Sequence, residues 1–334
     1  MIVALDAFGS DCAPAPEIEG AVQAIKENVC KKIIVFGKRE ILQKELDKYF
    51  YDKSRIEIVH AKDRITMDDS ASTAAKKKKE SSLVKGIKHH SEGKSDVFVS
   101  AGNTGAVMAA SLFTYGRIKN VLRPALALNF PTKTGSEILL DVGDNVDCNP
   151  TNIVQFAKLG SLYSQFFLKI DNPEVALLNI GEESKKGNDL SRKSYQLLEA
   201  ESDLNFVGNI EGKDLLKGAV DVIVCDGFVG NVMLKTVEGV ALSLFDMMKE
   251  QLSHDWIAKI GALLSYPVFS YIKKKLDHTE YGGALLVGLN GISVISHGRA
   301  NGKAIKNAIK FAAQMADSGF LSHAQEVFEG KENE

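Results

Sequence analysis

Two glycine-rich loops carry the side chains best suited to chemistry on a charged substrate. In NIGEESKKGNDL, Lys186 stands beside Gly187 and Asn188 after a strand-like run. A lysine in such a loop neutralises phosphate or the oxyanion of a carbonyl under attack. In DGFVGN, Asn231 stands at the start of the next expected helix, where its amide can donate to a developing oxyanion. A solvated lysine and a helix-capping asparagine are the structural alternatives.

A third loop, SAGNTG, has the composition of an oxyanion site. Its glycines allow the backbone to approach a ligand, and Ser100, Asn103 and Thr104 add short polar groups before an expected helix. A tight strand-to-helix turn also requires glycine, so a purely structural role is equally compatible with this pattern. The spacing is neither that of a Walker loop nor G-x-G-x-x-G, so it does not indicate nucleotide binding.

Similar loops end five strand-like runs, namely LDAFGSD, VSAGNTG, LDVGDN, LNIGEE and VCDGFVGN. This recurrence predicts an open α/β sheet whose strand ends share one anion-binding crevice. His297, in the glycine-flanked turn SHGR, is a further candidate ligand contact. The acids of these loops repel a bare phosphate, so we expect them to cap helices, orient cationic groups or hold a metal rather than contact the anion. No His/Cys/Asp spacing specifies a metal site.

Covalent catalysis by the protein itself finds little support. There is no G-x-S-x-G elbow, and the four cysteines form no C-x-x-C pair. Cys12, Cys148 and Cys225 lie near the loops, yet buried structural cysteine is the more frequent case.

Strand-like apolar runs alternate with helical stretches through most of the chain, which predicts a mostly parallel sheet covered on both faces. A helix is expected around Glu17–Glu27. The expected strands are Ile2–Leu5, Ile33–Phe36, Ile56–Val59, Val97–Ser100, Ala125–Leu128, Ile138–Leu140, Val175–Asn179 and Val220–Cys225. We expect a single domain over residues 1–330 and a polar tail at 331–334.

Residues 240–276 interrupt this alternation and are helical in character. An apolar stretch interrupted by Pro267 leads here into the basic cluster Lys273–Lys275, in the segment WIAKIGALLSYPVFSYIKKK. We predict that Pro267 breaks the helix into two arms of a hairpin with an apolar tip. An apolar surface beside a basic cluster suits the headgroup region of an anionic membrane. Burial of the hairpin in a dimer interface is the alternative of equal weight.

Composition limits the class of protein. The 334 residues have a net charge of -2, with 45% hydrophobic and 25% charged residues, so overall charge does not indicate nucleic-acid binding. The start MIVALDAFGSD lacks the basic region of a signal peptide, and the widely spaced cysteines suit a reducing compartment. We therefore expect a cytoplasmic protein with a peripheral contact to the membrane.

The order of a dozen motifs resembles that of the bacterial phosphate acyltransferase family, the acyl-ACP:phosphate transacylases of phospholipid synthesis. The resemblance runs nearly from end to end, through DAFGSDCAP, HAKDRITMDDS, KKKKESSL, VSAGNTGAVMAA, GRIKNVLRPALA, LLDVGDNVDC, QFAKLGS, LLNIGEESKKGNDL, NFVGNIEGKDL, VDVIVCDGFVGNVMLKTVEG, EYGGALLVGL and AIKNAI.

The resemblance implies a Rossmann-like three-layer α/β/α fold related to phosphotransacetylases and isocitrate-type dehydrogenases. It further implies a homodimer that converts acyl-ACP and inorganic phosphate into acyl phosphate and ACP, without a cofactor or a metal. A membrane-embedded glycerol-3-phosphate acyltransferase would then use the acyl phosphate, so the expected site of action is the inner face of the cytoplasmic membrane. The reaction we expect is direct phosphorolysis of the thioester, in which positioning and charge neutralisation are the main tasks.

Matching motifs carry the family's functional residues onto this chain. Lys186 and Asn231 are the expected catalytic residues. The expected phosphate and substrate contacts are Gly9, Ser10, Asp11, Ser100, Gly102, Asn103, Thr104, Gly105, Asn145, Gly187, Asn188, Asp226, Gly227 and His297. The expected membrane contacts are Leu263, Leu264, Tyr266, Val268 and Phe269, within the apolar tip Leu263–Tyr271. The basic run Lys76–Lys79 is a candidate contact for the acidic ACP, and a solvated helix face is its alternative.

The chain departs from the family pattern at seven positions, namely Phe8, Ser10, Cys12, Ala71, Leu285, Arg299 and Ala300. The family has an imidazole at position 12 and proline at positions 71 and 285. These changes leave the expected reaction class intact and affect the ligand contacts near Cys12 and Arg299.

Three alternatives remain open at this stage. A CoA-linked phosphotransacetylase would use the same crevice with short acyl groups. An NADP-linked dehydrogenase of the related fold would need nucleotide and metal sites. A non-enzymatic membrane scaffold would bind lipid without turnover.

Overall fold

One sheet organises the molecule in the computed structural model, which describes residues 1–253, 256–276 and 282–330. Within these residues the sheet has eleven strands in the order β3-β2-β1-β4-β11-β10-β5-β6-β9-β7-β8. The strands are β1 (Ile2–Asp6), β2 (Lys32–Gly37), β3 (Ile56–His60), β4 (Val97–Ser100), β5 (Ala125–Pro131), β6 (Ser136–Leu140), β7 (Glu174–Asn179), β8 (Asn205–Glu211), β9 (Val222–Val224), β10 (Ala284–Val287) and β11 (Ser293–Ile295).

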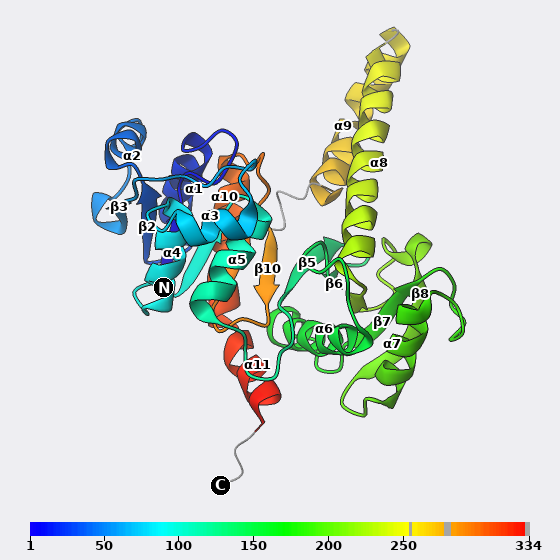
Figure 1. Cartoon of the computed structure of the whole chain (residues 1–334). Coiled ribbons are helices and arrows are strands. Elements are labelled where there is room, and N and C mark those ends of the chain that lie inside the picture. The colour runs from blue at the N-terminus through cyan, green and yellow to red at the C-terminus, as the bar shows by residue number, and fades with distance from the viewer. Residues whose placement is uncertain (254–255, 277–281, 331–334) are drawn as a thin grey trace.

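Helices join the strands and cover the sheet (Figure 1). They are α1 (Ala15–Lys26), α2 (Arg39–Leu46), α3 (Ala71–Lys77), α4 (Ser82–Ser91), α5 (Thr104–Tyr115), α6 (Pro150–Tyr163), α7 (Asp189–Ala200), α8 (Gly227–Ser253), α9 (Trp256–Leu276), α10 (Gly302–Asp317) and α11 (Phe320–Glu329). Three short helical turns complete the described elements, namely η1 (Lys53–Arg55), η2 (Ser164–Leu168) and η3 (Gly212–Asp214).

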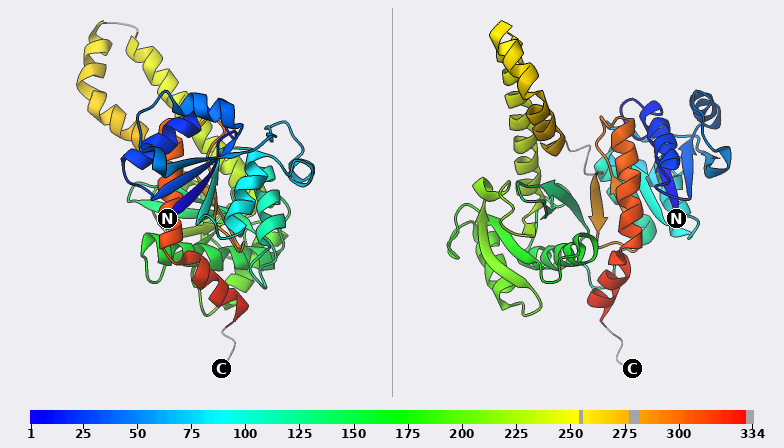
Figure 2. Two further views of the ribbon diagram at one scale, coloured as in Figure 1. Left: turned by 90° about the vertical axis from the view of Figure 1, so that its left-hand side faces the viewer. Right: turned by 180° about the vertical axis from the view of Figure 1, so that it is seen from behind.

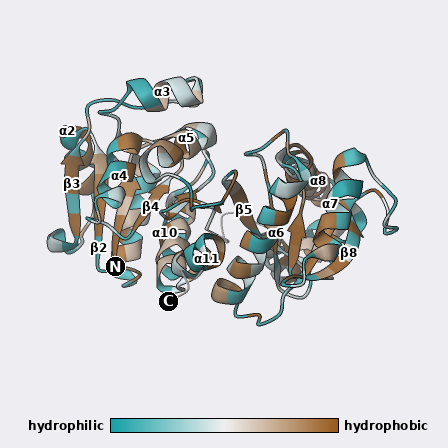
Figure 3. Ribbon diagram, turned by 60° about the horizontal axis from the view of Figure 1, so that its bottom comes forward, coloured by the Kyte–Doolittle hydropathy of each residue, from teal (hydrophilic) through white to brown (hydrophobic). Residues whose placement is uncertain are grey.

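Two apolar cores, one on each face of the sheet, make this a three-layer α/β/α fold. Alternate residues of β1 point to opposite faces, so Val3 and Leu5 belong to one core and Ala4 to the other. The first core includes apolar residues of α1, α6 and α10, and the second includes those of α4 and α5. Figure 3 shows the resulting pattern, with hydrophobic strands beneath helices whose outer faces are hydrophilic. The predicted mostly parallel sheet, covered on both faces, is confirmed.

The direction of the sheet reverses at its centre. Strands β3, β2, β1, β4 and β11 are mutually parallel, as are β6, β9, β7 and β8. Between them, β10 is antiparallel to β11 and β5, and β5 is antiparallel to β6. The two parallel halves therefore run in opposite directions. The glycine-rich loops follow strands of both halves, with those after β1 and β4 in the first half and those after β6, β7 and β9 in the second.

The predicted strands are all present, with ends shifted by a few residues, and three further strands lie outside the prediction. Strands β10 and β11 have four and three residues, too few for a clear period of two. Strand β8 lies at the edge of the sheet and contains Asn209 and Gly208, which depress the apolar signal.

Helices α8 and α9 form an antiparallel hairpin that projects from the body in all three views of Figures 1 and 2. The predicted break at Pro267 is wrong, because α9 runs through this residue without interruption. The proline lacks the N–H that would bond the preceding turn, but it lies on an exposed part of the helix where water can hydrate the released carbonyl. Helices α8 and α9 are themselves the two arms, so Leu263–Tyr271 forms part of an arm rather than the tip.

Residues 227–252 of α8 are long and apolar enough to span a membrane by length and composition, and only 6% of the most apolar stretch is buried. This exposed helix needs a covering partner or a lipid surface. The side chains of the predicted basic cluster Lys273–Lys275 and the polar tail 331–334 lie outside the described residues.

Buried carboxylates fix the first loop of the sheet. Glu17 of α1 is fully buried and accepts a hydrogen bond from the Ser10 backbone N–H at 2.8 Å. Burial raises the pKa of Glu17 to about 7. Asp6, at the end of β1, accepts a hydrogen bond from the Ser100 hydroxyl at 2.8 Å and joins the first loop to the loop after β4. Burial also raises the pKa of Asp6.

We predict that Glu17 makes folding stability fall between about pH 5 and pH 7. The folded protein binds this proton more tightly than the unfolded chain, so stability is lost as the carboxyl ionises in the folded state. A Glu17→Gln variant keeps the acceptor oxygen without the charge. Relative to the wild type, its free energy of unfolding in urea should rise across this interval and level off above it. A difference that does not vary with pH would show that Glu17 is not the group responsible.

Candidate active site

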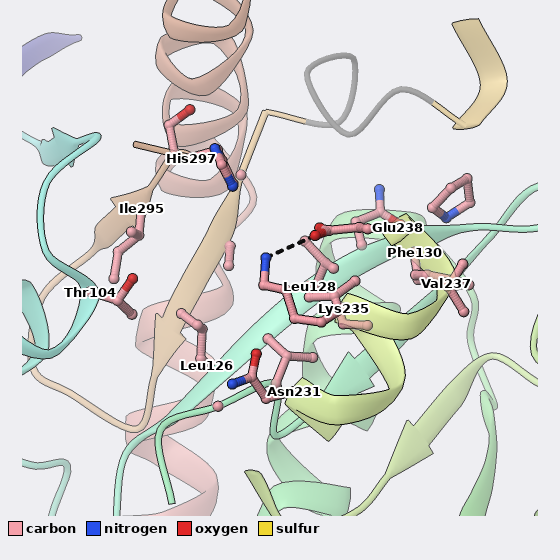
Figure 4. A pocket seen from close by; sticks show the side chains of 18 of the residues that line it. Thr104, Leu126, Leu128, Phe130, Asn231, Lys235, Val237, Glu238, Ile295 and His297 are labelled. Carbon is pink, nitrogen blue, oxygen red and sulfur yellow. Dashed lines mark hydrogen bonds and ion pairs between the residues drawn. The ribbon is translucent and has the colours of Figure 1, made fainter. Parts of the chain in front are cut away.

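A cavity of about 270 Å³ opens between α5 and α8 on one face of the central strands (Figure 4). Its floor is apolar, because Leu128 of β5, Ala284 of β10 and Ile295 of β11 are direct cross-strand neighbours. Leu126, two residues before Leu128, extends the same face. The floor suits an alkyl chain, and the polar groups stand on the walls.

The first wall consists of loops from the half of the sheet that contains β1. Gly9 packs directly on the loop after β4, where a Cβ would lie 2.7 Å from the Gly102 backbone nitrogen. The Asp11 backbone N–H donates to the Gly298 carbonyl at 2.8 Å, which ties in the turn after β11. Thr104, the exposed first residue of α5, and His297 line the cavity from this side. The loops after β1, β4 and β11 thus come together on this side of the cavity.

Several predicted contacts of this wall have structural partners. Ser10 and Ser100 are buried, and the Asn103 side chain caps α5 by accepting from the Ala106 backbone N–H at 3.0 Å. The amide of Asn103 also donates to the Met67 carbonyl at 3.0 Å, which holds the segment before α3 over the loop. Thr104, Ser296 and His297 are the polar residues of this wall that line the cavity.

The second wall depends on the carboxylate of Asp141, directly after β6. It accepts hydrogen bonds from the backbone N–H groups of Leu126, Gly143, Asp144 and Asn145 and from the Asn145 side chain, at 2.7–3.2 Å. Asn145 in turn packs against Gly227, where a Cβ would lie 2.8 Å from its backbone nitrogen. This contact brings the loop after β6 against the start of α8.

Asn231 lines the cavity from the first turns of α8. Its side chain lies beside Gly143, 3.3 Å from the position of a Cβ at that glycine. The exposed amide faces the cavity together with Thr104 from the opposite wall, as Figure 4 shows. Asp226 instead accepts from the Val229 backbone N–H at 2.9 Å and caps the helix. Asn231 therefore lines the cavity, and its catalytic role stays a prediction.

Lys186 occupies a different place. Its loop is held by the Asn179 amide, which donates to the Lys186 carbonyl at 3.1 Å, and Gly187 adopts a left-handed φ of 90°. Asn188 caps α7 through the Ser191 backbone N–H at 2.9 Å. The half-exposed ammonium of Lys186 lies 3.9 Å from Glu183 and does not belong to the described lining of the cavity. Its catalytic role stays a prediction.

The structure adds two charged residues to the cavity that sequence reasoning missed. Lys235 and Glu238 of α8 line it, and their charged groups lie 2.8 Å apart. Lys235 follows Asn231 by four residues, so both lie on one face of the helix. That spacing was the available signal for finding Lys235.

Asp144 is a further carboxyl that sequence reasoning missed. It follows the cavity-lining Gly143, and burial together with the neighbouring Asp141 raises its pKa to about 8. Its side chain is therefore largely protonated at neutral pH, which spares the second wall an additional negative charge.

Cysteine chemistry is disfavoured, because burial raises the pKa of Cys148 to about 11 and that of Cys225 well above its usual range. Among the described residues, no three His, Cys, Asp or Glu side chains gather in a way that could hold a metal ion. The cavity thus offers hydrogen-bond donors and a cation above an apolar floor. Such a site can bind an amphipathic ligand with an anionic or carbonyl group at one end.

Comparison with solved structures agrees with the fold. The phosphotransacetylase of Streptococcus pyogenes superposes with a TM-score of 0.62 at 15% identity, covering 95% of this chain and 94% of that protein. The EutD phosphotransacetylase of Staphylococcus aureus superposes with a TM-score of 0.59 at 16% identity, covering 95% and 94%. At such low identity the likeness concerns the fold alone.

Sequence comparison is more specific. Residues 1–323 match the family model described as fatty acid synthesis protein. A protein of Dictyoglomus turgidum named phosphate acyltransferase is 49% identical over 316 residues, which are 94% of each chain. A protein of the same name from Alkaliphilus oremlandii is 45% identical over 326 residues, covering 98% of this chain and 97% of the relative. Together with the cavity described above, these matches show that the chain belongs to the phosphate acyltransferase family.

Proposed function

We propose that this enzyme transfers a long-chain acyl group from acyl-ACP to inorganic phosphate and releases acyl phosphate and ACP. The observation that carries the proposal is the cavity itself, in which the amide of Asn231 and the hydroxyl of Thr104 stand above an apolar floor. Membership of the phosphate acyltransferase family supplies the reaction class. The apolar floor favours a fatty acyl group over a short polar one.

The proposed step is direct phosphorolysis. A phosphate oxygen attacks the thioester carbonyl carbon, a C–O bond forms, and the C–S bond breaks with its electron pair passing to sulfur. The thiolate of the carrier leaves and takes up a proton from solvent. Asn231 donates a hydrogen bond to the carbonyl oxygen as negative charge develops there. Lys186 neutralises charge on phosphate, which requires its flexible side chain to reach from the loop after β7.

Acyl carrier protein is the proposed donor, and the basic segment around α3 is its proposed contact. Residues 62–85 contain seven Lys and Arg and four Asp and Glu, in a chain of net charge -2. Lys76, Lys77 and Lys79 are exposed, and the Lys76 ammonium lies 4.7 Å from the centroid of the half-exposed Phe113 ring. A basic patch around an apolar ring complements an acidic partner.

The patch is joined to the cavity through α5. Ala71, the first residue of α3, is 3.0 Å from a Cβ position at Gly105, in the first turn of α5. From Gly105 to Phe113 the axis of α5 rises by about 12 Å, at about 1.5 Å per residue. A carrier docked at Phe113 would therefore deliver its acyl arm along α5 toward Thr104.

The helical hairpin is proposed to serve both as the homodimer contact and as the contact to the membrane surface. Its second arm, α9, exposes Leu263, Leu264, Tyr266 and Val268 by 58–77%, and a contiguous apolar surface of this kind marks a contact to a protein partner or a membrane. Phe269, the fifth predicted contact, is half-buried. Acyl phosphate is amphipathic, so release at the inner face of the cytoplasmic membrane would pass it to a membrane-embedded glycerol-3-phosphate acyltransferase for phospholipid synthesis.

The function is tested by incubating the protein with long-chain acyl-ACP and phosphate and trapping acyl phosphate with hydroxylamine. Omission of phosphate should abolish the product, and Lys186→Ala or Asn231→Ala should lower kcat by roughly 100- to 1,000-fold. Lys185→Ala is the matched control and should retain turnover. Faster reaction with short-chain acyl-CoA than with long-chain acyl-ACP would favour a CoA-linked phosphotransacetylase. Near-normal kcat in both folded variants would remove the catalytic assignments.

The docking surface is tested by the triple variant K76E/K77E/K79E. At low salt its KM for acyl-ACP should rise by about tenfold because the patch would repel the acidic carrier. Its KM for acyl-pantetheine, which lacks the carrier, should stay unchanged. The control K44E/K48E/K53E makes the same change of charge around α2 and η1. Equal effects of the two triple variants on acyl-ACP would contradict docking at α3.

The hairpin is tested by flotation with anionic phospholipid vesicles. The double variant L263D/L264D should bind vesicles at least about tenfold more weakly, because two exposed apolar side chains are lost. F50D, which changes an apolar residue exposed by 93% outside the hairpin, is the control. Sedimentation equilibrium without lipid should show a wild-type dimer. Flotation of the double variant like the wild type, or a wild-type monomer, would refute the corresponding role.

A further inference from the structure

We infer that Lys235 binds inorganic phosphate inside the cavity, one helical turn from Asn231, and that Glu238 holds the ammonium in place while the site is empty. The inference rests on the proposed function, since it names the residue that would receive the phosphate substrate. It assigns to the KTVE segment of α8 a role that the glycine-rich loops do not supply.

The position of Lys235 is the first argument. Among the described residues that line the cavity, Lys235 is the lysine, and it stands four residues after Asn231 on the same face of α8. Figure 4 shows its side chain extending over the floor formed by Leu128 of β5. A phosphate beside this ammonium would lie next to the amide that faces the proposed carbonyl. Lys186, by contrast, lies on a loop outside the described lining.

The surroundings of the ammonium are the second argument. The floor beside it is apolar, and the Lys235 side chain is 55% exposed, so phosphate can reach the ammonium from solvent. The Glu238 carboxylate, 2.8 Å away and mostly shielded from solvent, is the partner that balances Lys235 in the structure. Phosphate presents several acceptor oxygens, so it can share or replace that partner without leaving the ammonium unpaired. The flexible stem of lysine permits this exchange.

An ordinary surface pair on one helix would have a different signature. An ion pair between exposed side chains of one helix contributes little to stability. Such a pair is lost equally when either partner is neutralised, so Lys235→Met and Glu238→Gln would then have the same effect. Phosphate binding by Lys235 predicts unequal effects, because only the first variant removes the cation.

The experiment measures phosphate in two ways on the full-length protein. Calorimetric titration with inorganic phosphate gives affinity without turnover, and the hydroxylamine assay gives separate KM values for phosphate and acyl-ACP. Lys235→Met should weaken phosphate binding and raise the phosphate KM by about 10- to 100-fold, as expected for a lost charge-assisted contact. Its KM for acyl-ACP should change by less than about twofold, within the scatter of additive sites.

Matched variants make the result specific. Lys235→Arg should recover most of the phosphate affinity, and Glu238→Gln should change it by less than about threefold. Lys249→Met, on the same helix but outside the described lining of the cavity, should behave as the wild type. Equal losses in Lys235→Met and Glu238→Gln, or an equal rise of both KM values, would overturn the inference. A wild type that binds phosphate through Lys235 yet forms no acyl phosphate would instead refute the proposed function.

Discussion

The carboxylate of Asp141 is the interaction on which the rest of the site depends. Five donors converge on it, four from the backbone and one from the Asn145 side chain. One of them belongs to Leu126 of β5, so the same group joins the floor of the cavity to the wall above it. The start of α8 then packs so closely that a Cβ at Gly230 would collide with the Asp141 carbonyl oxygen. Asn231 follows directly, and its place is set by this contact.

The sequence predicts the elements whose conformation depends mainly on their own residues and immediate neighbours in the chain. Short continuous apolar runs such as Val97–Ser100 and Val175–Asn179 favour buried strands, and the small polar residues after them favour turns and helix caps. The antiparallel centre of the sheet could not be predicted. Strands β10 and β11 are too short to show a clear alternation of apolar and polar residues, and β10 pairs with β5, which is distant in the sequence. The break expected at Pro267 failed because its stretch of helix is solvated, a condition set by tertiary structure.

The same distinction applies to the site. Asn231 and Thr104 each stand in a glycine-rich segment where a strand gives way to a helix, which is the signal that points to them, and the structure brings both to one cavity. Lys186 has the same local signature, but the cavity lies elsewhere, and only the course of the sheet decides this. Lys235 lacked any loop signature, since a lysine on a helix is usually solvated. Lys235 lines the cavity because α8 packs opposite strands that are distant in the sequence, so the residues around Lys235 do not indicate this position.

The alternation of side chains along β5 has a consequence for how such a site can change. Leu126 and Leu128 face the cavity, whereas Ala127 between them belongs to the core on the far side of the sheet. Substitution at the two leucines therefore alters the depth of the apolar floor while the polar groups on the walls keep their supports. Ligand size selectivity can therefore change through the residues of the sheet, while the chemistry at the polar end of the ligand depends on the loops and helices that form the walls.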